Sequence, residues 1–150
     1  QGILVSSDYD AEGHHPILLC WRARLAAKQS NPQLQLLREA ADTVGRTWTH
    51  QQARCFLNIS RAWAEHVELF PQSRQLSVEF AEQALAISDA SGYRYYAMRA
   101  RKILGKLCPN DVERARHLRV SEAIGRSLSA TLSTEDSHRF LARNEIKRRI

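Results

Sequence analysis

Apolar residues recur at every third or fourth position between residues 47 and 92, with one interruption at Phe70-Pro71. This spacing is typical of amphipathic helices, so the segment predicts two consecutive helices joined by a short turn. Gly92 follows the second helix, where a residue with left-handed backbone often ends a helix. The two apolar stripes consist of Phe56, Ile59, Trp63 and Val67, and of Leu76, Phe80, Ala84 and Ile87.

The same periodicity predicts helices on both sides of this central pair. One runs from Pro16 to about Gln29, and a second begins at Asn31-Pro32 and ends at Gly45. Three more are expected after Gly92, including a short last helix that begins with a capping box at Ser133. The first helix carries Ile17, Leu18, Trp21 and Leu25 as its apolar stripe, and its tryptophan is expected in the core.

Similar segments recur around Ala40, Ala84 and Ala123, which are separated by 44 and 39 residues. A unit of two antiparallel helices cannot bury its apolar face alone and therefore stacks on its neighbours. The sequence thus predicts an all-α solenoid of stacked helical hairpins with about seven helices. No alternating apolar and polar run extends beyond about five residues, which disfavours a sheet.

The chain is expected to hold one domain. Residues 1–15 are polar and contain a Gly-His-His break, so they are expected to be an irregular lead-in or tag residue, and residues 16–150 to be the repeat domain. The chain starts with Gln1, which suggests a piece of a longer polypeptide. No signal peptide and no apolar run of about 18 residues is present, and three scattered cysteines fit buried thiols, so a cytoplasmic protein is expected.

Charge is distributed unevenly along the chain. Residues 1–92 hold 8 Lys and Arg against 10 Asp and Glu, whereas residues 93–150 hold 14 against 6. The first part therefore carries a formal charge of −2 and the second part a formal charge of +8. This asymmetry is compatible with an anionic partner for the second part, and equally with a solvated basic helical surface.

Several positions resemble a degenerate tetratricopeptide repeat. Phe56, Ile59-Ser60 and Trp63 are similar to the first-helix half of that pattern, and Leu104-Gly105 matches its small contact residue. Ser77, Ala81 and Ala84 stand at second-helix positions, whereas Arg101 and Cys108 depart from the pattern and the units exceed 34 residues. The C-terminal part also resembles repeats that follow a kinase or ATP-binding module in large bacterial signalling and regulatory proteins.

The resemblance implies that the first helix of each pair lines a concave face. Six side chains would then face a partner there. They are Arg54, Asn58, Arg61, Arg99, Lys102 and Lys106. The first three and the last three of these residues each lie on one helix face at steps of three and four, so each group of three can converge on one ligand. We therefore expect a basic groove that binds a protein or peptide segment, possibly acidic, through charge-assisted hydrogen bonds.

No catalytic, cofactor or metal motif is visible, so a non-catalytic module is expected. His14-His15 and the Glu65-His66 pair lack a metal-ligand spacing, and His66 is expected at the surface. One alternative is nucleic-acid binding through the cations after residue 92, with Tyr93, Tyr95 and Tyr96 nearby. Another is an oligomerisation module of a signalling ATPase or kinase. A membrane role is not expected.

Overall fold

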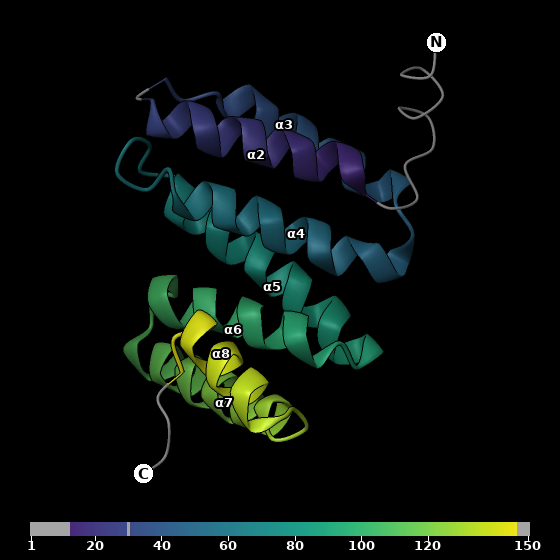
Figure 1. The fold of residues 1–150 in the computed structure, drawn as a ribbon. Helices are drawn as coiled ribbons and strands as arrows, with labels where there is room; N and C mark the ends of the chain where they lie inside the picture. Colours follow the sequence, from purple (N-terminus) through teal and green to yellow (C-terminus); the bar gives the residue numbers. More distant parts are fainter. Residues whose placement is uncertain (1–12, 30, 147–150) are drawn as a thin grey trace.

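Seven α-helices and one short 3-10 helix build the part of the chain that the computed structural model describes, residues 13–29 and 31–146 (Figure 1). No strand occurs within these residues, so the all-α prediction is confirmed. The helices are α2 (His14–Lys28), α3 (Leu34–Thr43), η1 (Val44–Arg46), α4 (Thr49–Ala64), α5 (Ser73–Ser91), α6 (Arg94–Leu107), α7 (Asp111–Ser129) and α8 (Thr134–Arg143).

The helices form three antiparallel pairs, α2 with α3, α4 with α5, and α6 with α7. Helices α2, α4 and α6 lie side by side, and α5 also packs against α6. Figure 1 shows the pairs stacked one below another, with α8 lying against α7 and in front of α6. This is a solenoid of helical hairpins. The surface formed by α2, α4 and α6 is called the first-helix face below.

Several predicted helix ends are confirmed. Gly92 ends α5 with a φ of 73°, and Ser133 caps α8 by accepting a hydrogen bond from the backbone N–H of Asp136 at 3.2 Å. The predicted start at Asn31-Pro32 is wrong, because α3 begins at Leu34 after an uncapped Gln33. Helix α4 ends at Ala64, well before Pro71, and the chain turns through residues 65–72.

The largest apolar cluster lies between the first two pairs and surrounds Trp63, which is 2% exposed. Small residues allow the two helices of a pair to approach closely. The Ser60 hydroxyl donates to the Ser77 carbonyl at 2.7 Å, and the Ser77 hydroxyl donates to the Ser60 carbonyl at 2.8 Å. In the next pair a Cβ on Gly105 would meet the Leu118 side chain at 2.5 Å. Larger side chains at these contacts would push the helices apart.

Four expectations are wrong in detail. Trp21 is 63% exposed and not in the core, because it borders the hollow between α2 and α4 and no described helix covers it. His66 is fully buried and hydrogen-bonds the Ala62 carbonyl through Nδ1 at 2.7 Å, so it is not a surface residue.

Ala123 is exposed, whereas Ala40 and Ala84 are buried, so the third copy of that motif is out of register. His14 and His15 belong to α2 and not to an irregular lead-in; residues 1–12 of that predicted segment lie outside the described residues.

The cysteines are buried, as the apolar helix faces around them predicted. Burial and, to a smaller extent, the nearby Cys55 raise the pKa of the Cys20 thiol to about 12. Cys20 is therefore protonated at neutral pH and packs as a small apolar side chain.

Candidate partner-binding groove

The six predicted site residues divide between two hollows on the first-helix face. Four of them line one cavity of about 380 Å³, which we call the basic groove. Arg54 and Asn58 instead line a hollow of about 590 Å³ together with α2. The four residues of the basic groove are Arg61 on α4 and Arg99, Lys102 and Lys106 on α6. Arg61 and Lys102 thus face the same cavity, whereas the predicted Arg54 and Asn58 lie outside it.

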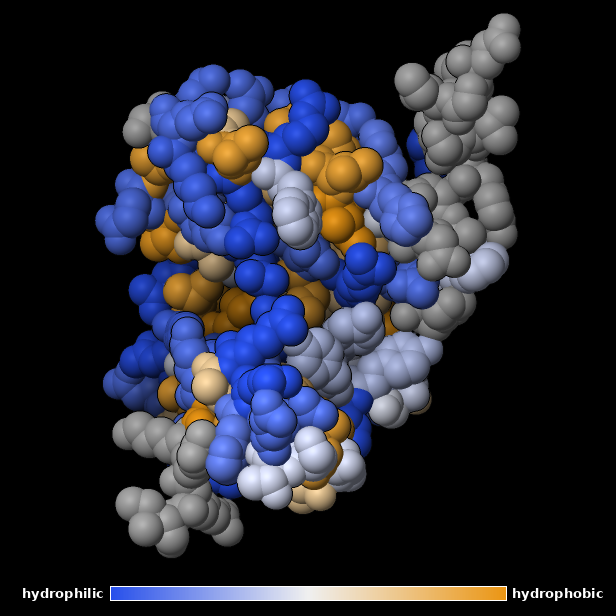
Figure 2. Space-filling view, viewed as in Figure 1, coloured by the Kyte–Doolittle hydropathy of each residue, from blue (hydrophilic) through white to orange (hydrophobic). Residues whose placement is uncertain are grey.

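The end of α8 completes the basic groove with residues that sequence analysis missed. Arg143, Asn144 and Glu145 form its remaining polar wall. Five cationic side chains and one carboxylate therefore line the cavity, so its potential is positive. Figure 2 shows hydrophilic side chains bordering a hollow between α4 and α8. Only the capping signal at Ser133 pointed to α8 in the sequence, and it says nothing about where that helix packs.

The backbone at the end of α8 fixes the direction of Glu145. The N–H of Ile146 donates to the Leu141 carbonyl at 2.8 Å, and the N–H of Glu145 donates to the Ala142 carbonyl at 3.1 Å. This is the hydrogen-bond pattern of a Schellman motif, in which the residue after the cap adopts left-handed backbone. Glu145 does so with a φ of 56°, although glycine would be less strained there. Ile146 then packs against Leu141 and Met98, which anchors the turn.

The Glu145 carboxylate already neutralises part of the groove. Its Oε2 lies 3.2 Å from Nζ of Lys102 and 3.7 Å from Nζ of Lys106. Lys102 also donates to the Asn144 carbonyl. The hydrogen bond with Lys102, followed by the charges of both lysines, holds the pKa of Glu145 below its usual value. The pairing is therefore present at neutral pH and is lost as the pH falls through that lowered pKa.

Arg61 keeps its charge without a matching partner. Its guanidinium forms no hydrogen bond or salt bridge with any residue in the described part of the chain, and its side chain is half-buried. Burial lowers the pKa of Arg61, and the positive charges of Arg99 and Arg24 lower it further. The charge of Glu65 opposes this shift, but the Glu65 carboxylate is bound by Arg24, whose Nε and a terminal nitrogen lie 2.9 and 2.7 Å from Oε1. An anion in the groove would relieve the repulsion on Arg61.

Aromatic residues support only one of the α6 cations. The Arg99 guanidinium lies 5.8 Å from the centre of the Tyr95 ring and donates to the Tyr95 hydroxyl at 2.9 Å. Arg101 points elsewhere, because its terminal nitrogens lie 3.2 Å from Nδ1 of His117 and 3.7 Å from Oδ2 of Asp89. The cations considered for nucleic-acid binding are thus spread over two sides of α6. They do not form one continuous strip.

The second hollow is more apolar. Arg54 and Asn58 line it together with Ile17, Leu18 and Trp21 of α2. The Asn58 amide donates to the Arg54 carbonyl one turn earlier at 2.9 Å, so part of its hydrogen-bonding capacity is used within α4. This hollow offers apolar surface with one cation at its edge, and not the converging charges that were predicted for the trio.

Within the described residues, no group of three or more His, Cys, Asp or Glu side chains is placed to hold a metal ion. None of the described helices combines the length and the apolar character needed to cross a membrane. Comparison of the chain with protein-family models, with curated proteins and with solved structures found no match. The tetratricopeptide resemblance therefore stays a prediction, and the argument for function rests on the geometry of the grooves.

Proposed function

We propose that this chain is a non-catalytic protein-interaction module whose basic groove binds an acidic segment of a partner protein. The fold supplies the means, because stacked helix pairs present neighbouring first helices as one binding surface. The resemblance to repeats of large bacterial signalling proteins favours a place beside other domains in a cytoplasmic regulator. The groove then serves as the recognition element of that regulator, and bond-making chemistry belongs to other domains.

One observation carries this proposal: the groove lysines already bind a carboxylate. Lys102 and Lys106 both contact Glu145, while Arg61 and Arg99 line the same cavity and contact no carboxylate of the described residues. An acidic segment can replace Glu145 on the lysines with one carboxylate and offer its other carboxylates to the two guanidiniums. Charge-assisted hydrogen bonds of this kind contribute about 1.5–3 kcal/mol each.

Charge reversal at both walls of the groove tests the proposal. The probe is a fluorescein-labelled peptide of alternating glutamate and glycine, and its fluorescence anisotropy is measured against the wild type and the variant R61E/K102E. We expect the variant to bind at least about ten-fold more weakly, which corresponds to about 1.4 kcal/mol. The matched control R116E/R119E makes the same change in net charge on exposed positions of α7. It is expected to retain nearly all of the affinity.

Equal losses in the groove variant and in the control would show that net charge alone attracts the peptide, and the groove would then have no special role. Unchanged affinity in R61E/K102E would also refute the proposal. A single-stranded oligonucleotide of matched charge is measured in parallel. Tighter binding of that oligonucleotide, with a steep loss on adding salt, would favour the nucleic-acid alternative.

A further inference from the structure

The outer side of α2 exposes an apolar stripe. Leu18, Trp21 and Leu25 are 62%, 63% and 60% exposed and follow one another at steps of three and four, so they lie on one face of the helix. Figure 2 shows apolar surface gathered over α2. Large apolar side chains exposed together in this way mark interaction sites more often than three scattered ones would.

The register of the repeats shows what this face corresponds to. Ala23, Ser60 and Gly105 are each buried, and Ser60 and Gly105 contact the second helix of their own pair. When the first helices are aligned on these residues, the face in question contains equivalent positions in all three pairs. They are Leu18, Arg22 and Leu25 in α2, Cys55, Ile59 and Ala62 in α4, and Ala100, Leu104 and Leu107 in α6. Trp21 corresponds instead to Asn58 and Ile103, which are half-buried and line the hollows of the first-helix face.

In α4 and α6 these positions bury against the preceding helix pair. Ile59 belongs to the same buried cluster as Leu37 and Ala40 of α3. Leu104 packs with Val78 and Ala81 of α5 in the same way. Leu18 and Leu25 thus stand at positions that are covered in two established interfaces, both of which receive an apolar helix. Because helices pack together through apolar stripes, this face of α2 is also suited to bind the apolar side of a helix.

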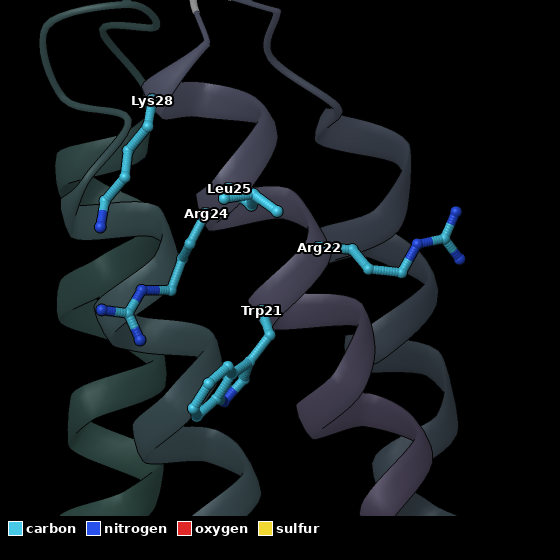
Figure 3. A pocket seen from close by; sticks show the side chains of 5 residues that line it. All are labelled: Trp21, Arg22, Arg24, Leu25 and Lys28. Atoms are coloured by element: carbon cyan, nitrogen blue, oxygen red, sulfur yellow. The ribbon is translucent and has the colours of Figure 1, made fainter.

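Charges on α2 define the chemistry of that occupant. Figure 3 shows Trp21 and Leu25 between cationic side chains, with Arg24 and Lys28 extending to one side and Arg22 to the other. Arg22 and Lys28 are exposed, and Arg22 replaces the buried Ile59 and Leu104 of the equivalent positions. Tryptophan and arginine are enriched in interfaces between separate proteins, whereas a permanent stacking face would be uniformly apolar.

We propose that α2 docks an amphipathic helix of a partner protein, with the partner's apolar stripe on Leu18, Trp21 and Leu25 and its carboxylates beside Arg22 and Lys28. The helix lies on α2 as α5 lies on α6. This surface is separate from the basic groove. The proposal therefore stands whether or not the groove binds an acidic segment.

A peptide with the sequence of α5, residues 73–91, is a suitable probe. It contains Glu79, Glu82 and Asp89 against a single Arg74, and its helix already covers the equivalent face of α6. Binding is followed by tryptophan fluorescence in a W48F background, where Trp21 is exposed and Trp63 is buried. We expect the emission of Trp21 to shift to the blue as the peptide covers it.

The variant L18E/L25E, made in the same background, is expected to reduce the peptide's affinity at least about ten-fold. The control V112E/L132E adds the same charges at exposed apolar positions outside α2 and is expected to leave binding unchanged. A peptide with serine at Val78 and Leu85 should bind poorly, because its apolar stripe is interrupted.

Absence of a fluorescence shift at any peptide concentration would overturn the proposal, as would equal binding by L18E/L25E and the parent. Sedimentation of the protein without peptide addresses a second copy as the occupant. A dimer that L18E/L25E dissociates would assign the stripe to self-association and refute the partner helix. Circular dichroism establishes that each variant is folded, which is expected because both substituted leucines are exposed.

Discussion

The two ends of the stack of first helices present different chemistry. In the repeat register, Arg99 and Lys102 of the basic groove correspond to Ile17 and Cys20 of α2, and both of these α2 residues are buried. The α2 end exposes apolar surface bordered by cations, whereas the α6 end encloses a basic groove closed by the end of α8. Equivalent positions therefore differ in exposure as well as in residue type, so what each end can bind also depends on which neighbouring elements cover it.

The two ends also differ in how far they are covered. At the α6 end, Glu145 and the Asn144 carbonyl already contact Lys102, so a ligand must compete with the chain itself. At the α2 end, the described residues place no helix over Leu18 or Leu25. Binding at the groove is therefore expected to be an exchange of carboxylates, and binding at α2 to be burial of exposed apolar area.

The largest expected effect separates the covered and exposed faces. L104A removes a side chain that is 1% exposed between α5 and α6, and we expect it to lower the free energy of unfolding by about 2–5 kcal/mol. L18A, on the corresponding face of α2, is expected to change it by less than about 0.5 kcal/mol. Urea denaturation followed by circular dichroism measures both. Similar losses in the two variants would contradict the contrast between these faces.

Most of the fold was predictable because it follows from periodicity and capping. The stripes around Ile59 and Ala84 and the ends at Gly92 and Ser133 required only local information. The position of Trp21 was not predictable in this way, since an apolar stripe does not reveal whether a neighbour covers it. His66 was missed because its burial depends on the turn after α4, where the helix ends early.

The candidate site was predictable only in part. Helical spacing brought Arg99, Lys102 and Lys106 onto one face, and the repeat register brought Arg61 beside them. The contribution of Glu145 depends on a left-handed residue that is not glycine, and on the packing of Ile146 against Met98, which is distant in sequence. No local pattern encodes that contact. Arg54 was assigned to the groove because equivalent positions were assumed to share one hollow.

The next effect concerns the competition at the groove. E145A removes the carboxylate that contacts Lys102 and Lys106, so we expect the glutamate–glycine peptide to bind more tightly, by up to about five-fold, because the peptide no longer has to displace an exposed ion pair, and such pairs are weak. E82A removes an exposed carboxylate from α5 and is the matched control. Fluorescence anisotropy at fixed ionic strength gives both affinities.

If E145A binds the peptide no better than E82A does, Glu145 does not occupy the ligand's place. The difference should also depend on pH. Because the pKa of Glu145 is lowered, its carboxylate stays charged and competes at neutral pH, and the competition weakens as the pH falls through that pKa. The advantage of E145A over the wild type is therefore expected to shrink in acid.

The smallest expected effect distinguishes the two sides of α6. Burial lowers the pKa of His117 below 6.5, and the charges of Arg101 and Arg116 lower it further. The neutral ring therefore stabilises the fold above pH 6.5, and this contribution is lost as the pH falls through the lowered pKa. We expect R101A to raise the pKa of His117 and R99A to leave it unchanged, as measured by NMR titration of the ring protons. An equal shift in both variants would mean that the two arginines share one environment.

The most direct test of the central claim, that an acidic segment binds between α4, α6 and α8, is an NMR titration of the isotope-labelled protein with the glutamate–glycine peptide. We predict that the largest amide shifts fall at Arg61, Lys102 and Glu145, and that the amide of Arg119 on α7 barely moves. Shifts that instead gather on α7, or that are spread evenly over exposed cations, would contradict the assignment of the basic groove as the binding site.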